Sequence, residues 1–177
     1  MQLEGYAEKP TATIWTKRLE CFVPGLPETK GSMKAFKKPG ARFASITASN
    51  AGKLGQWQGR VAEIAGAHFA GPIIDGPVKM EMIFYFLRPE SHFRTSKSGT
   101  GRDLRNGAPV LMSNGKDLDK LERAIFDALS KLVYVDDRQV CGVVKWKHYA
   151  APERPGGVRI VVLVPVEDRT KLRGIPG

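Results

Sequence analysis

Apolar residues recur along the chain at two spacings, and each spacing predicts a different kind of element. Between about Ser49 and Phe69 they lie three and four positions apart, which predicts a helix capped by Ser49 or Thr47. A similar pattern predicts a second helix from about Asp117 to Leu132. The buried faces predicted for the two helices consist of Leu54, Trp57, Val61, Ile64, Ala65 and Phe69, and of Leu118, Leu121, Ala124, Ile125, Ala128, Leu129 and Leu132.

Alternating or continuous apolar runs predict the strands. The run Val78–Leu87 begins after a Pro- and Gly-containing turn, and its length and apolarity indicate a central strand. Further strands are predicted at Leu19–Val23, Gln139–Ala150 and Val158–Val166. We therefore expect one domain over residues 18–166. A loose arm would precede it at residues 1–17, and a loose tail would follow at residues 167–177.

The charge of the chain narrows the class of function. Its 177 residues contain 28 Lys and Arg against 18 Asp and Glu, a formal net charge of +10. This excess of positive charge favours a protein that binds polyanions, above all nucleic acid, over a protein whose surface is basic without such a role. No apolar run approaches the ~20 residues of a membrane span, and no signal peptide is evident, so we expect a cytoplasmic protein. Cys21 and Cys141 have apolar neighbours and are expected to be buried thiols without zinc or a disulfide.

The cations gather in two segments that lack a clear apolar period. Residues 28–43 combine lysines with Phe36 and Phe43, which fits either a phosphate-binding loop or a solvated hairpin. Residues 88–116 are rich in Gly and Ser, and their length and charge predict a lid that orders on DNA. The residues expected to contact DNA, including lysines near the second helix, are Lys30, Lys34, Lys37, Lys38, Arg42, Arg94, Lys97, Lys116, Lys120, Lys145 and Lys147.

Two pairs of carboxylates flank the second predicted helix. Asp117 and Asp119 lie at its start, and Asp136 and Asp137 follow its end. Carboxylates suit Mg²⁺, which can activate water for phosphodiester hydrolysis. Acids in a DNA-attracting protein would also repel the substrate unless a cation lay between them. A helix of about fifteen residues spans roughly 22 Å. The two pairs can therefore meet only through a returning strand or a twofold partner.

The same acids also have purely structural interpretations. Asp117 can cap the helix, and Asp119 suits the positive end of its dipole. Asp136 and Asp137 can form a simple turn. Asp119, Arg123 and Asp127 are spaced four apart and could form an exposed ladder of ion pairs.

At residues 116–140 the sequence resembles the RusA family of Holliday-junction resolvases. The family pattern is Asp-x-Asp-Asn-Leu-x-Lys, then Asp-Ala-Leu within a helix, then an aromatic-x-Asp-Asp-x-Gln-Val turn. The matching residues are Asp117-Leu118-Asp119-Lys120-Leu121-Glu122-Arg123, Asp127-Ala128-Leu129 and Tyr134-Val135-Asp136-Asp137-Arg138-Gln139-Val140. Lys120 replaces the family's Asn, Arg123 replaces its Lys, and Lys116 replaces a usual Pro.

The resemblance implies an α+β fold, a two-layer sandwich in which a mixed β-sheet has two helices packed on one face. It implies a homodimer that uses Mg²⁺, with Mn²⁺ as a substitute, and no organic cofactor. Each protomer would nick one strand of a four-way DNA junction during recombination and repair. Asp117, Asp119 and Asp137 would be metal ligands and catalytic residues, Asp136 a further candidate ligand, and Arg123 the catalytic cation.

Two other functions fit the same residues. In a non-catalytic DNA-binding module, the acids would serve only as caps and turns. A nuclease for flaps or other branched DNA would use the same carboxylates on a different substrate.

Overall fold

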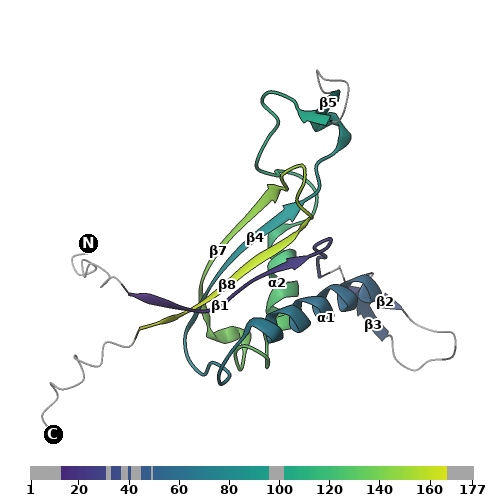
Figure 1. Cartoon of the computed structure of the whole chain (residues 1–177). Coiled ribbons are helices and arrows are strands. Elements are labelled where there is room, and N and C mark those ends of the chain that lie inside the picture. Colours follow the sequence, from purple (N-terminus) through teal and green to yellow (C-terminus); the bar gives the residue numbers. More distant parts are fainter. Residues whose placement is uncertain are drawn as a thin grey trace, which may run out of the picture.

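In the computed structural model, the described residues are 13–30, 33–36, 40, 45–48, 50–95 and 102–166. They form an α+β domain in which a four-stranded sheet carries two helices (Figure 1). The sheet strands are β1 (Trp15–Pro24), β4 (Val78–Phe86), β7 (Val140–Tyr149) and β8 (Gly157–Pro165). The helices are α1 (Ala51–His68) and α2 (Leu118–Leu129). The short elements are β2 (Met33–Phe36), β3 (Ser45–Ala48), β5 (Phe93–Thr95), β6 (Arg102–Leu104) and the 3₁₀ turns η1 (Glu90–His92) and η2 (Asp137–Gln139).

The sheet is mixed and has the strand order β1-β8-β4-β7. β8 runs antiparallel to both β1 and β4, whereas β4 and β7 are parallel. A parallel pair needs a long crossover connection, and α2 lies in the connection between β4 and β7. β4 is central, as its apolar run predicted, and β1 and β7 are the outer strands.

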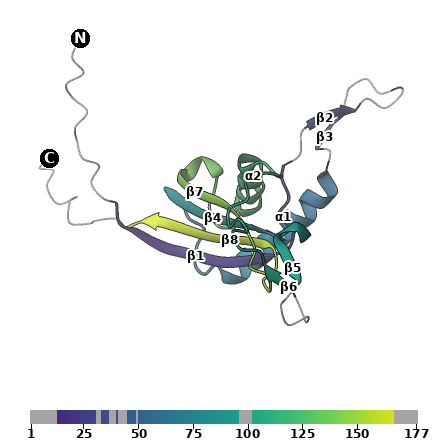
Figure 2. The ribbon, with the colours of Figure 1, turned by 90° about the horizontal axis from the view of Figure 1, so that it is seen from above.

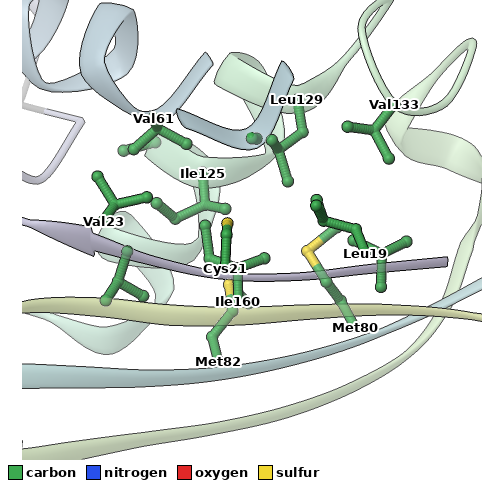
Figure 3. Packing of buried hydrophobic residues seen from close by; sticks show 14 of the residues in the cluster. Leu19, Cys21, Val23, Val61, Met80, Met82, Ile125, Leu129, Val133 and Ile160 are labelled. Carbon is green, nitrogen blue, oxygen red and sulfur yellow. The ribbon is translucent and has the colours of Figure 1, made fainter. Parts of the chain in front are cut away.

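Both helices pack on one face of the sheet, as Figure 3 shows from close by. Alternate residues of the strands point to that face, because successive side chains of a strand point to opposite sides. Val61 of α1 and Ile125 of α2 meet Cys21, Met80 and Ile160 of the sheet in one continuous core. The predicted apolar stripes of both helices therefore form the helix layer of the core, and Trp57 is buried in it.

Some expectations need correction. β1 begins at Trp15, so the last residues of the expected N-terminal arm pair with β8. α1 begins at Ala51, and its N-cap residue is Asn50 instead of the expected Ser49 or Thr47. Cys21 is buried, but Cys141 is exposed, because it lies at the start of the outer strand β7. The expected tail at 167–177 lies outside the described residues.

The two cationic segments contain strands that the apolar pattern did not predict. β2 and β3 pair as an antiparallel two-stranded sheet and stand off from the main sheet (Figure 2). β5 and β6 form another such pair within the expected lid. Each has only three or four residues. None of the helices in the described part of the chain is long and apolar enough to cross a membrane.

Gly157, the first residue of β8, lies where no side chain fits. An added Cβ would overlap the carbonyl oxygen of Val23 and lie 2.7 Å from Cζ of Phe22. We expect Gly157→Ala to lower the free energy of unfolding by about 1–3 kcal/mol, since β1 must move away from β8. Chemical denaturation measures this effect. Gly59→Ala is the control: its Cβ meets nothing within 4 Å, so the helix should gain up to about 1 kcal/mol. Equal stability of Gly157→Ala and wild type would contradict the expectation.

Candidate active site

The first acidic pair lies at the exposed start of α2. Asp117 is the N-cap residue of the helix, and Asp119 lies in its first turn. The Asp117 side chain makes no capping hydrogen bond; it forms an ion pair with Lys120 at 2.9 Å and is 59% exposed. This ammonium group, by its hydrogen bond and its charge, holds the pKa of Asp117 below its usual value. Asp117 is therefore a carboxylate at neutral pH, and it is open to solvent.

Cationic side chains anchor this start of α2 to the rest of the chain. Lys116 donates to the carbonyl of Pro27 at 2.6 Å and forms an ion pair with Glu28 at 2.7 Å. Lys147 of β7 donates to the carbonyls of Asn114 and Lys116, each at 2.9 Å. The Asp117 end of α2 is thus held beside the far end of β7.

The cationic segment after β1 is also fastened to α2. The backbone N–H of Lys30 donates to the carbonyl of Lys120 at 3.1 Å. The Lys30 ammonium forms an ion pair with Asp127 at 2.8 Å. Asp127 therefore pairs with Lys30 and not with Arg123, so the possible ladder of Asp119, Arg123 and Asp127 does not form in the described part of the chain. The cationic segment instead begins alongside the acidic pair.

The second acidic pair lies beyond the other end of α2, at η2. Asp136 caps this turn: it accepts a hydrogen bond from the backbone N–H of Arg138 at 3.0 Å, and Gln139 completes a capping box. The Arg138 guanidinium also donates to both carboxylate oxygens of Asp136, at 2.8 and 3.1 Å. These contacts lower the pKa of Asp136 to about 2. Asp136 is committed to the turn, while the neighbouring Asp137 is exposed.

We expect Arg138→Gln to raise the pKa of Asp136, because the guanidinium is the main cause of its low value. The backbone hydrogen bond remains, so the new pKa should lie between about 2 and 3.8. A carboxylate with a lowered pKa favours the folded state above its unfolded pKa, and this contribution is lost as the pH falls toward about 2. Carboxyl ¹³C NMR titration of the metal-free protein reads the shift, with Arg94→Gln as a distant control. An unchanged Asp136 titration would exclude Arg138 as the cause.

The two acidic pairs do not meet within one chain. Asp117 lies at the level of Lys147 on β7, whereas Asp137 lies three residues before Val140, where β7 begins. Seven residues of strand separate these levels, which is roughly 23 Å, and the 12 residues of α2 span roughly 18 Å. Among the described residues, no three His, Cys, Asp or Glu side chains form a group that could hold a metal ion. β7 leads from the turn back toward the start of α2, so Asp137, which precedes the strand, stays at the other end of the helix.

The cations expected to contact DNA differ in their surroundings. Lys30, Lys116, Lys120 and Lys145 each form an ion pair with an acid; the partner of Lys145 is Glu122. Arg94 is exposed on β5. Lys34 is a residue of strand β2. The cations outside the described residues are Lys37, Lys38, Arg42 and Lys97.

The acids that hold these lysines could not be identified from local patterns in the sequence. Glu28 lies 88 positions from Lys116, and Glu122 lies 23 positions from Lys145. Local spacing rules reach only one helical turn. The only available signal was the presence of acids near lysines in a chain with an excess of positive charge.

The fold and this surface together define an α+β domain with exposed carboxylates at the start of a helix, in a strongly basic protein. The model of the family described as endodeoxyribonuclease RusA matches residues 25–162, so the chain belongs to the RusA family. It is also similar to the uncharacterized protein YqaN of Bacillus subtilis (strain 168), with 31% identity over 94 residues. That match covers 53% of this chain and 64% of YqaN, so the chain spans less than two thirds of this relative.

Proposed function

We propose that this protein is a magnesium-dependent endodeoxyribonuclease that resolves four-way DNA junctions by paired nicks. The observation that carries the proposal is the RusA match over residues 25–162, which includes both acidic pairs. The exposure of Asp117 supports it, because a reacting phosphate can approach a carboxylate at the surface. The net charge of +10 supports DNA as the substrate.

The donors present fit a magnesium ion. Asp117 and Asp119 offer carboxylate oxygens within the first turn of one helix, and Mg²⁺ commonly takes one or two carboxylates together with waters and phosphate oxygens. Mn²⁺ accepts the same kinds of ligand. When bound, the metal would supply a water of lowered pKa and a positive charge beside the scissile phosphate. For Asp117 to serve as a ligand, its ion pair with Lys120 must open, which frees that ammonium for the DNA backbone.

The second acidic group would come from a twofold partner. Asp137 lies beyond the far end of α2, whose 12 residues span roughly 18 Å, so it is too far from Asp117 of its own chain for both to hold one ion. A second copy could supply Asp137 to the Asp117–Asp119 pair, and symmetry would then give two equivalent sites. Two sites suit two nicks in one junction, so we propose a homodimer as the working form.

The test is cleavage of a synthetic four-way junction with Mg²⁺, comparing wild type with Asp117→Asn. We expect the variant to nick at least about 10²-fold more slowly, because a neutral amide is a poor magnesium ligand. Its circular dichroism should match that of wild type. Its junction affinity without metal should be at least as high, because the substitution removes a negative charge and releases the Lys120 ammonium. Equal nicking by the variant would exclude Asp117 as a catalytic residue.

The same assay separates the alternatives. A non-catalytic binding module would bind the junction unchanged by a chelator and would cut nothing. A nuclease for other branches would cut flaps or forks faster than the four-way junction in a panel of DNA shapes. Thermal denaturation with added Mg²⁺ or Mn²⁺ gives an independent readout: the melting temperature should rise with metal in wild type and not in Asp119→Asn.

A further inference from the structure

A pocket of about 830 Å³ opens at the end of the sheet where β4 finishes, outside the acidic pairs. Phe22, Tyr85 and Arg159 line it. Each of them lies between two buried residues of its strand, so its side chain points to the face of the sheet away from the helices. The end of β6 and the loop between β7 and β8 complete the walls. The volume lies within the range of about 300–1,000 Å³ of pockets that enclose a small organic ligand.

Aromatic rings form one side of this pocket. Phe22 of β1 and Tyr85 of β4 are separated by β8 in the sheet, yet their ring centroids lie 6.2 Å apart in an edge-to-face arrangement. They can meet because the residue of β8 opposite Tyr85 is Gly157, where a side chain would lie 2.7 Å from Cζ of Phe22. The Tyr85 ring also contacts His148 of β7, with centroids 5.9 Å apart. Phe22 remains 40% exposed, so the row of rings offers a surface on which a flat ring can stack.

The charges that line the pocket are all positive. They belong to Arg88, Arg154 and Arg159, and none of the lining residues in the described part of the chain is acidic. Arg88 is held in the wall, because it donates to two backbone carbonyls at 2.9 and 2.8 Å. Arg159 forms an ion pair with Glu20 beside the pocket. Arg154 is exposed and forms no ion pair with any other described residue, so its guanidinium is available to an anion at the mouth.

We propose that this pocket binds the base of an unpaired DNA nucleotide, stacked on Phe22 and Tyr85, with a phosphate of the same strand on Arg154. A flat ring beside an anion is the chemistry of a nucleotide, and every base can stack on an aromatic ring. A guanidinium can bind two phosphate oxygens at once. Bases of an intact duplex are paired and stacked, so only an unpaired base can enter a pocket. The choice of DNA rests on the proposed function and on the net charge of +10.

The pocket lies at the same end of β7 as the first acidic pair. Tyr149, the last residue of β7, lines the pocket, and its hydroxyl oxygen lies 3.4 Å from Oδ1 of Asn114. The carbonyl of Asn114 accepts from Lys147, which also holds the carbonyl before Asp117. One strand can therefore run from the start of α2 past Tyr149 to the pocket. A nucleotide held there would fix the position of that strand relative to the acidic pair.

Binding of a short fluorescent thymidine oligonucleotide tests the pocket, measured by anisotropy with the full chain and a chelator present. Phe22→Ala should weaken this binding about 5- to 100-fold, the usual effect of losing one stacked base. Phe22→Tyr keeps a ring and should bind as wild type does. Affinity for a blunt duplex of the same length should not change in either variant, because paired bases do not enter the pocket. Ile73→Ala is the control, since Ile73 is 46% exposed and does not line the pocket.

A second variant tests the phosphate contact without disturbing the core. Arg154→Gln changes an exposed residue of a loop. The plot of log affinity for the oligonucleotide against log salt concentration should become less steep by about 0.7, the value for one phosphate contact on a single strand. Lys17→Gln should leave this slope unchanged, because Lys17 is exposed at the other end of β1 and does not line the pocket.

The outcomes separate the pocket from the nuclease. Unchanged oligonucleotide binding by Phe22→Ala, or an equal loss on single strand and duplex, would overturn the pocket as a site for an unpaired base. Tighter binding of the matching uridine RNA than of the thymidine strand would overturn DNA as its occupant. A wild type that cuts no junction, with a selective loss in Phe22→Ala, would overturn the proposed nuclease and leave the pocket standing.

Discussion

We expect an equimolar mixture of Asp117→Asn and Asp137→Asn chains to regain junction nicking that each variant alone lacks. If each site combines Asp117 of one copy with Asp137 of the other, a mixed dimer contains one doubly altered site and one intact site. Random mixing makes half of the dimers mixed, so about a quarter of all sites are intact. We therefore expect about a quarter of the wild-type nicking rate, measured on a labelled four-way junction after the two chains are unfolded and refolded together.

The matched control is a mixture of Asp117→Asn with Asp119→Asn. Both substitutions fall in the same acidic group at the start of α2, so every site in a mixed dimer carries one of them. This mixture should stay inactive. Differently tagged chains show by co-purification that mixed dimers have formed. Failure of the first mixture despite verified mixed dimers would mean that Asp117 and Asp137 do not act in a shared site.

The fold was predictable because its signals are local. The apolar run of β4 and the stripes of α1 and α2 extend over nine residues or more, and the structure confirms that each supplies a buried face. β2, β3, β5 and β6 were not predicted, because a segment of three or four residues is too short to show a period. Cys141 has apolar neighbours in sequence, but its exposure follows from the place of β7 in the sheet.

The distance between the two acidic pairs could not be predicted from the sequence. Residue types and spacing identified Asp117, Asp119, Asp136 and Asp137 as candidate ligands, but their separation depends on the direction of β7. That direction is set by the pairing of β7 with β4, some sixty residues earlier in the chain, and not by any local pattern. The structure also separates the roles of the second pair, since Asp136 is held by Arg138 in a turn cap. Asp137 therefore remains the proposed ligand of the two.

The second large effect on the nicking rate is expected from substitution of Arg123. It lies one helical turn after Asp119, so both side chains share the exposed face of α2. Lys30, Lys116, Lys120 and Lys145 each form an ion pair with an acid, whereas Arg123 forms none within the described part of the chain. Arg123 is thus a cation beside the acidic pair that can meet a phosphate without first breaking an ion pair. A planar guanidinium can bind two phosphate oxygens at once.

We expect Arg123→Ala to lower the nicking rate at saturating junction by about 10²–10³-fold, since it removes a charge that would stabilise the transition state. Junction affinity without metal should change little, because many other cations contribute to it. Arg123→Lys restores the charge but not the bidentate geometry, so its rate should lie between the two. Lys17→Ala removes one exposed lysine from the start of β1, the outer strand opposite β7, and should leave the rate unchanged. If Arg123→Ala instead weakened affinity and kept the saturated rate, Arg123 would position DNA and a different cation would have to face the reacting phosphate.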